Sequence, residues 1–524
     1  MKYRNTITYF ACAAILPALA LSCTKGYEGF NTNPDAIQEI DSKSHITTMI
    51  MDAVIPCSDV GANEFQRACN LMGDAFCGYL SPTQAFNGGS YTCTYDLDGT
   101  DYNNYPFSVA FTNVMPAWLN LKYAHANGLV GDEIFAVAEV IKVMTLQRVS
   151  DIYGPLPVSH FGEDRNPYES QETVYKNLFS DLDGAIEVLS NYASASGGTT
   201  TLTSVDPVFN GDYSKWYKLA NSEKLRMALR IRYAEPSLAR QYAEEAVAAG
   251  VMTSSADGAW LKSSATIQVF NPLEEVWNAY RDTRMGATMD CYLNGYQDPR
   301  LPVYFSESTV EGGGYHGVRS GIKTMTQDNY TPLSAPNVSK STPVVWLLAS
   351  EVAFLRAEGA LIGWNMGGEA GQLYEEGVAL SFEERGLSSS AAAAYVASPK
   401  TPVAFEDMNL STSRNSYQAP SDITPVWNDE DGEEKNLERI ITQKWIAMYP
   451  NGQEAWSEFR RTGYPKVIPV KDNLSDGKID TEIQVRRMTF PRSEYANNLA
   501  ELQNAVALIG GSDNGGVRLW WDKK

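Results

Sequence analysis

Residues 131–155 read GDEIFAVAEVIKVMTLQRVSDIYGP, and this stretch shows which secondary structure dominates the chain. Its apolar side chains recur at intervals of three and four residues, which is the period of an α-helix and not of a β-strand. Acidic residues follow Gly131, and Gly154-Pro155 ends the pattern, as at the two ends of a helix. The stretch therefore predicts a long amphipathic helix that packs against other helices.

The same periodicity extends over most of the chain. Several periodic runs come in pairs joined by short turns, as in helical hairpins. No strict self-similarity at roughly 34 residues is visible, so the pattern alone does not establish a tetratricopeptide repeat. Short strands are predicted at 91–95 and 484–489, which gives an all-α fold with minor short β-hairpins. The other predicted helices span 43–55, 64–80, 107–126, 172–192, 214–233, 236–249, 343–362, 369–385, 436–449 and 493–508.

Long connections rich in aromatic, Gly, Asn, Ser and Thr residues separate these helices. Loops above about 15 residues are uncommon unless they bind something or are disordered, and the aromatic content argues against disorder. None of them has the composition of a linker, so we expect one large domain over residues 23–524. The connections are 81–106, 194–213, 260–343, 398–436 and 465–491.

The N-terminus has the pattern of an export signal. Lys2 and Arg4 precede an uncharged apolar stretch over 7–21, followed by Ser22-Cys23. The sequence around Cys23 resembles a lipobox, with Ala20 where leucine is usual, and predicts a lipoprotein signal peptide over 1–22 and lipidation of Cys23. The alternatives are a plain cleaved signal or an uncleaved anchor, although this stretch is short for a membrane span. No later apolar run reaches the roughly 18 residues of such a span, which favours an exported, tethered protein.

Composition excludes some classes of function. The 524 residues include 63 acidic and 42 basic side chains, a net charge of −21, which argues against a nucleic-acid-binding protein. Only four histidines are present and no two lie close in sequence, which argues against a histidine-rich metal site. Beyond the signal and Cys23, an odd number of cysteines remains. At most two disulfides can form, and buried free thiols are expected for Cys57, Cys69, Cys77, Cys93 and Cys291.

Local catalytic signatures are missing. The chain has no G-x-S-x-G, H-E-x-x-H, Walker-type phosphate loop or C-x-x-C motif, and we predict no cofactor. Paired carboxylates could support glycoside hydrolysis, but they occur everywhere in so acidic a chain. Asp96, Asp98 and Asp101 could offer oxygen ligands to calcium, without the spacing of an EF-hand. A solvated acidic turn is the favoured interpretation of these three residues.

Aromatic residues in the long connections indicate binding. Flat rings beside Asn, Asp and Arg suit a ligand site, because an apolar face stacks on a sugar ring or a peptide side chain while polar neighbours fix its orientation. The alternative for any single ring is that it holds a loop onto the helices. As a group they predict a ligand site. The candidates are Phe86, Tyr91, Tyr95 and Tyr102 in one loop, where Tyr105 also lies, Trp277, Tyr280 and Arg281 in another, and Trp427 before an acidic turn.

Several motifs, in order along residues 23 to 522, together resemble the SusD/RagB family of nutrient-binding outer-membrane lipoproteins. Each motif is modest alone, but their ordered combination is specific. They include FNTNP at 30–34, DIYGPLP at 151–157, GDYSKW at 211–216, DPRL at 298–301, ITQKWIAMYPNGQEAW at 441–456, FPRSEY at 490–495 and LWWD at 519–522.

The resemblance implies an all-α fold in which four tetratricopeptide-like helix pairs support a loop-rich half with the ligand site. It also implies a partner, a SusC-like TonB-dependent transporter, on whose extracellular face the lipoprotein acts as a hinged lid. No catalytic step belongs to the family. The family's shared motifs are scaffold, so no ligand residue is carried over. Arg226, Arg230 and Glu358 are expected to form internal salt bridges, because buried charges in such helices are normally paired.

Three functions remain open from the sequence. The first is a non-catalytic surface lipoprotein that captures an oligosaccharide or oligopeptide for import. The second is a secreted all-α glycoside hydrolase, and the third is a tetratricopeptide-type structural adaptor without a small ligand. Glycan and peptide are equally open, because stacking rings suit both and an acidic protein attracts basic peptides.

Overall fold

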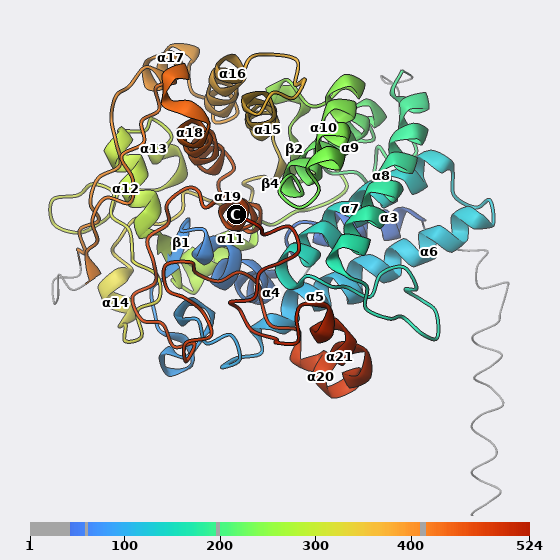
Figure 1. Ribbon diagram of the computed structural model, residues 1–524, viewed down its shortest axis with the longest axis horizontal. Coiled ribbons are helices and arrows are strands. Elements are labelled where there is room, and N and C mark those ends of the chain that lie inside the picture. The colour runs from blue at the N-terminus through green and yellow to red at the C-terminus, as the bar shows by residue number, and fades with distance from the viewer. Residues whose placement is uncertain (1–41, 58–60, 195–199, 409–414) are drawn as a thin grey trace, which may run out of the picture.

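The computed structural model describes residues 42–57, 61–194, 200–408 and 415–524. Helices dominate these residues and the strands are short, so the predicted all-α fold is confirmed (Figure 1). Within the described residues, no helix is both long and apolar enough to cross a membrane. The signal peptide predicted at 1–22 and the lipidation site predicted at Cys23 lie outside them.

Long helices pack in antiparallel neighbours and form what we call the helical frame. Within it, α7 packs on α8, α9 on α10, α15 on α16, and α3 on α6. Figure 1 shows α15, α16 and α18 along the top of the molecule and α7 to α10 on its right. The frame consists of α3 (Ser42–Asp52), α6 (Met115–Ala126), α7 (Asp132–Tyr153), α8 (Gln171–Ala193), α9 (Tyr213–Arg230), α10 (Pro236–Ala249), α15 (Ala349–Leu361), α16 (Ala370–Glu383), α18 (Gly432–Ala447) and α19 (Gly452–Thr462).

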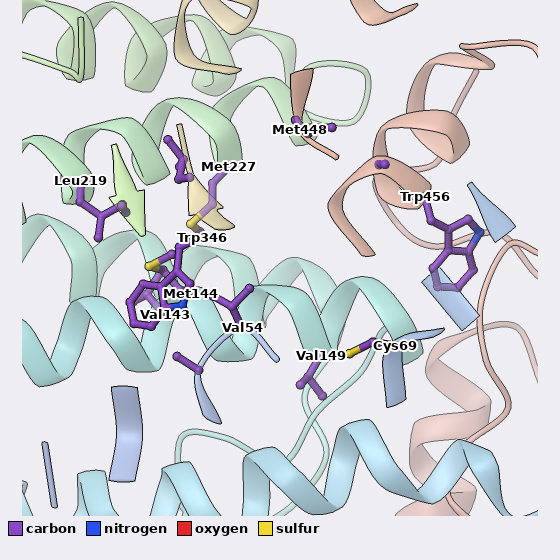
Figure 2. Packing of buried hydrophobic residues seen from close by; sticks show 14 of the residues in the cluster. Val54, Cys69, Val143, Met144, Val149, Leu219, Met227, Trp346, Met448 and Trp456 are labelled. Atoms are coloured by element: carbon purple, nitrogen blue, oxygen red, sulfur yellow. The ribbon is translucent and has the colours of Figure 1, made fainter. Parts of the chain in front are cut away.

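Helix α7 lies at the centre of this frame. Its boundaries agree with the sequence, since Gly154 with φ 93° ends it and donates its backbone N–H to Ser150 O at 2.7 Å. The expected amphipathic stripe is wrong, because every residue from Val140 to Tyr153 is buried. Figure 2 shows Val143 and Met144 packed among side chains of α9 and β4, with Cys69 beside Val149 further along α7. The helix therefore has neighbours on all sides.

Two small antiparallel pairs interrupt the helices. Strand β1 (Leu80–Pro82) pairs with β3 (Thr283–Met285), and β2 (Ala259–Leu261) pairs with β4 (Val344–Leu347). The strand predicted at 91–95 is wrong, because Thr94 bonds locally to Tyr91 and closes a 3₁₀ turn over Thr92–Thr94. The one predicted at 484–489 is also wrong, since it has no strand partner.

Other boundaries differ from the prediction. Residues 344–347 form β4 instead of the start of a helix, as β-branched valines favour. The run at 64–80 is α4 (Gly61–Phe65) followed by the π-helix η2 (Gln66–Asp74), and the run at 107–126 is α5 (Tyr105–Ser108), η6 (Val109–Val114) and α6. The last run breaks at Asn498 into α20 (Arg492–Asn497) and α21 (Leu499–Leu508). Helices missed in the sequence are α11 (Pro272–Glu274), η8 (Glu275–Ala279), α12 (Ala287–Tyr296), α13 (Leu301–Tyr304), α14 (Gln327–Tyr330), α17 (Ser389–Val396) and α19.

Buried ion pairs connect the helices of the frame. Arg226 Nε on α9 lies 2.9 Å from Glu351 Oε1 on α15, and Arg230 Nε lies 3.0 Å from Asp151 Oδ2 on α7. Glu358 pairs with Arg232 at 2.7 Å and also with Arg461 of α19. The predicted internal salt bridges of Arg226, Arg230 and Glu358 are thus confirmed. Because these groups are fully buried, each depends on its partner.

The five described cysteines are buried free thiols, as expected. Burial raises the pKa of Cys69 to about 12 and that of Cys93 to about 12. Thiols with such pKa values are protonated at neutral pH and react slowly.

Candidate ligand-binding site

The pairing of β1 with β3 brings the two ring-bearing loops together. Pro82 lies opposite Thr283, and immediately beyond this pair Thr83 N donates to Asp282 O at 3.0 Å. The chain leaving β1 leads to Phe86, while the chain entering β3 carries Tyr280. Loops that are about 200 residues apart in sequence therefore meet at one edge of a two-stranded sheet.

Helix η2 adds an arginine to this edge. The Arg67 guanidinium lies 4.9 Å from the ring centroid of Tyr105 and 5.8 Å from that of Tyr102. Burial raises the pKa of Tyr102 and of Tyr280, and the positive charge of Arg67 opposes the rise at both hydroxyls. Phe86 packs on the same small apolar cluster as Tyr102. We call Arg67, Phe86, Tyr102, Tyr105, Tyr280 and Arg281 the rim.

Arg67 has the clearest features of a ligand-binding group. It is half-buried, it contacts tyrosine rings, and it forms no ion pair with a carboxylate in the described part of the chain. Its charge is therefore not neutralised by a carboxylate of the described chain, although the protein as a whole is acidic, with a net charge of −21. Its five N–H groups form a fixed donor fork, of which one contacts the hydroxyl of Tyr105. Arg67 could not be found by sequence reasoning, because its neighbours are close only in three dimensions.

Two predicted ligand residues are buried. The exposed fraction of Tyr91 is 0% and that of Tyr95 is 2%, so neither offers a ring face to a ligand. Tyr91 packs against Phe86 with centroids 5.6 Å apart, and Tyr95 packs against Phe76. The turn over Thr92–Thr94 directs both rings inward. They hold the loop onto the frame, which is the alternative role of a single ring.

The two tryptophans have different surroundings. Trp277 lies on η8, close in sequence to Tyr280, and donates its Nε1–H to Val338 O at 2.8 Å, which fixes this short helix. Trp427 packs on Tyr374 of α16 and donates to Asp429 at 2.7 Å. Figure 1 shows α16 and α18 at the top of the molecule, whereas β1 lies at about mid-height on the left and α14 towards the lower left. Trp427 therefore belongs to the frame and not to the rim.

The weak calcium candidates do not converge. The Ser90 hydroxyl donates to Asp96, Asp98 lies 3.8 Å from Lys478 Nζ, and Asp101 is exposed. Among the residues with described positions, no three His, Cys, Asp or Glu side chains gather in a way that could hold a metal ion.

Deeper hollows lie away from the rim. A pocket of about 800 Å³ lies between α3 and the segment 267–275, with the exposed Phe270 at its edge, and one of about 370 Å³ lies beside the C-terminus. Neither pocket includes a rim residue, and neither lies at the β1–β3 edge where the two ring-bearing loops meet. We therefore assign the candidate site to the rim.

Comparison with known proteins identifies the family. The family profile described as "SusD-like: Susd and RagB outer membrane lipoprotein" matches residues 29–522. This chain belongs to the SusD/RagB family. No curated protein matches the sequence at a significant level. The resemblance found in the sequence motifs is confirmed, and the family's description places its members at the outer membrane.

Solved structures of SusD homologues share the whole fold. A chitin-binding SusD homologue from Flavobacterium johnsoniae is 37% identical, with a TM-score of 0.86, over 92% of this chain and 99% of that one. A SusD homologue from Bacteroides thetaiotaomicron is also 37% identical, with a TM-score of 0.83, over 93% of this chain and all of its own. A further structure, described as a chitin-binding protein, is 25% identical with a TM-score of 0.73.

Proposed function

We propose that this SusD-like protein is a non-catalytic surface lipoprotein that captures an oligosaccharide at the rim for import. The observation that carries the proposal is the contact of Arg67 with the rings of Tyr102 and Tyr105, at the edge where the loop with Tyr280 meets the loop with Phe86. Family membership supports a binding role, and it supports a place at the outer membrane.

A glycan is favoured over a peptide. Two similar structures are described as chitin-binding, and one of them is 37% identical to this chain. Aromatic rings stack on the C–H faces of pyranose rings, while a guanidinium donates several hydrogen bonds to hydroxyl or carbonyl oxygens. We therefore take a chito-oligosaccharide as the first ligand to test.

The chemistry at the rim is recognition without bond cleavage. Stacking on Tyr102 and Tyr280 would remove apolar faces of the sugar and of the rings from water, and Arg67 would fix the orientation of the sugar. In the lid model, bound sugar favours the closed state of a complex with a SusC-like TonB-dependent transporter, because it contacts both partners only when closed. The frame would pack on that transporter, and a lipid on Cys23 would anchor the chain.

Calorimetry on the mature chain without lipid tests the ligand. We expect chitohexaose to bind with a measurable heat and to be recovered intact after prolonged incubation. Arg67→Ala and Tyr280→Ala should each weaken binding, whereas Trp427→Ala, which removes a ring outside the rim, should not. Cleavage of the sugar would support the hydrolase alternative, and an absence of binding across chitin, cellulose, starch and peptide fragments would support the adaptor.

A second experiment tests the partner. Purification of the protein from outer membranes should recover a TonB-dependent transporter, and mass spectrometry of the complex should identify the trapped nutrient. Cys23→Ala should abolish incorporation of radiolabelled palmitate and release the protein from the membrane. Recovery of the native chain without any transporter would contradict the lid model.

A further inference from the structure

A buried carboxylate lies directly beneath the rim. Asp282, between Arg281 and β3, is 5% exposed and takes part in no ion pair in the described chain. Its Oδ2 accepts a hydrogen bond from Gln66 Nε2 at 2.8 Å, and its Oδ1 accepts from Gln327 Nε2 at 2.9 Å and from Gln84 Nε2. Three neutral amides are thus its side-chain hydrogen-bond donors, and the charge of Arg281 acts on it without an ion pair.

Two of these glutamines adjoin rim residues in sequence. Gln66 begins η2 and directly precedes Arg67, so the bond to Asp282 fixes the start of the helix that carries the guanidinium. Gln84 lies two residues before Phe86, in the loop that leaves β1. Hydrogen bonds to a charged acceptor are shorter and stronger than neutral ones, which suits them to hold separate segments in register.

The third glutamine holds the segment with Tyr280 and Arg281. Gln327, at the start of α14, also donates to Tyr280 O at 2.9 Å, and its Oε1 accepts from Arg281 Nη2 at 3.1 Å. Arg281 has φ 58°, a left-handed conformation that is costly for a residue with a side chain. Such a conformation persists only where the surroundings impose it, and Thr83 contributes by donating its hydroxyl to Arg281 O at 2.6 Å.

The charge on Asp282 also sets the direction of each amide. An ionised carboxylate only accepts hydrogen bonds, so each glutamine must turn its NH₂ group toward Asp282 and its oxygen away. For Gln327 the oxygen thereby faces Arg281. For Gln84 the oxygen has no donor in the described chain, so it remains available to a ligand hydroxyl or acetamido N–H.

We propose that Asp282 is a positioning residue of the rim, which fixes both the register of four segments and the polarity of Gln66, Gln84 and Gln327 without touching the ligand. The proposal rests on the proposed function, since the ligand is taken to be an oligosaccharide with N–H and O–H donors. It goes further by assigning acceptance of one such donor to Gln84.

The test compares Asp282→Asn with the wild type and with Asp101→Asn, which makes the same change at an exposed position. An asparagine offers either an oxygen or an NH₂ group, so the glutamines are no longer held in one orientation. We expect the side-chain amide NMR signals of Gln66, Gln84 and Gln327 to move or broaden in Asp282→Asn and to stay in place in Asp101→Asn. Binding of chitohexaose should weaken about tenfold in Asp282→Asn only.

A double variant separates positioning from folding. In Asp282→Asn with Gln84→Glu, the carboxylate lies at position 84 and accepts from the amide at 282. This variant should recover the melting temperature lost by Asp282→Asn, if any is lost, but not binding, because Gln66 and Gln327 are still without the carboxylate at 282 that fixes their orientation. Unchanged amide signals together with binding within about twofold in Asp282→Asn would overturn the proposal. If the wild type binds no oligosaccharide, the proposed function fails, while the amide signals still decide whether Asp282 positions the glutamines.

Discussion

Asp151 in the frame and Asp282 beneath the rim are both buried carboxylates with several donors, but their donors differ in kind. Asp151 accepts from Arg230 Nε at 3.0 Å and from Trp521 Nε1 at 2.8 Å, and it also bonds to Tyr175. Asp282 accepts from three glutamine amides and from no cation. The first arrangement neutralises charge inside a helical core, and the second retains a charge that orients neutral groups.

The two carboxylates are expected to affect different properties: Asp151 the stability of the fold, and Asp282 the recognition of the ligand. Breaking a buried ion pair leaves an uncompensated charge and is strongly destabilising. Removing the charge at Asp282 leaves amides that find other partners or water, because the rim adjoins solvent. We therefore expect changes around Asp151 to alter the free energy of unfolding, and changes at the rim to alter affinity.

The largest expected effect is in the frame. Arg230→Met removes the cation shared by Asp151, Glu454 and Glu458, and should lower the free energy of unfolding by about 3–5 kcal/mol. The control Arg240→Met breaks an exposed pair with Glu244 on α10 and should cost less than about 1 kcal/mol. Urea unfolding followed by circular dichroism measures both. Equal losses in the two variants would contradict the role given to the buried pair.

The next effect concerns a ring that the sequence assigned to the ligand. Tyr91→Ala empties a buried site and should cost about 3 kcal/mol of unfolding free energy. The Tyr91 hydroxyl is buried without a hydrogen-bond partner in the described chain, so Tyr91→Phe should be neutral or stabilising and should bind sugar as the wild type does. A loss of affinity in Tyr91→Phe would place this residue in the ligand site after all.

A smaller effect, on affinity alone, is expected at the rim. Tyr280→Ala removes a partly exposed ring and should weaken oligosaccharide binding by about 1–2 kcal/mol, roughly tenfold, with little change in melting temperature. Trp427→Ala is the matched control, because it removes a larger ring outside the rim. If Tyr280→Ala and Trp427→Ala lose the same affinity for the oligosaccharide, the distinction between frame and rim is wrong.

Asp74 provides the most specific test, because this buried carboxylate has neither the cation of Asp151 nor the three amides of Asp282. The Asp74 side chain is buried and forms no ion pair in the described chain. Burial raises its pKa to about 7, although the hydrogen bond from Asn70 acts to lower it. A raised pKa gives stability that is present below about pH 4 and is lost as pH rises to about 7. Asp74→Asn should remove this loss and gain about 3 kcal/mol over the wild type between pH 4.5 and 7.5, because each pH unit up to the folded-state pKa is worth about 1.4 kcal/mol. The free energy of unfolding of both proteins is measured across this pH range, with Asp101→Asn as the exposed control. A difference between Asp74→Asn and the wild type that does not change with pH would contradict the raised pKa of Asp74.

The sequence predicted the frame better than the site. Periodicity located α7 and the paired helices, and motifs identified the family, because helical spacing and helix-ending glycines are local properties. Helix α19 was missed, since Glu454, Glu458 and Arg461 give it a polar appearance although partners on other helices bury them. Arg67 was missed because only the β1–β3 pairing brings it close to the rings of distant loops. Tyr91 and Tyr95 were assigned to the ligand because a one-dimensional pattern does not show which way a turn directs a ring.

The most direct test of the central claim is a crystal structure of the mature protein with the oligosaccharide that binds best in calorimetry. We predict sugar rings stacked on Tyr102 or Tyr280, with Arg67 donating to the sugar and the Asp282 network unchanged. Sugar bound instead in the pocket beside Phe270, or against Trp427, would contradict the assignment of the ligand site to the rim.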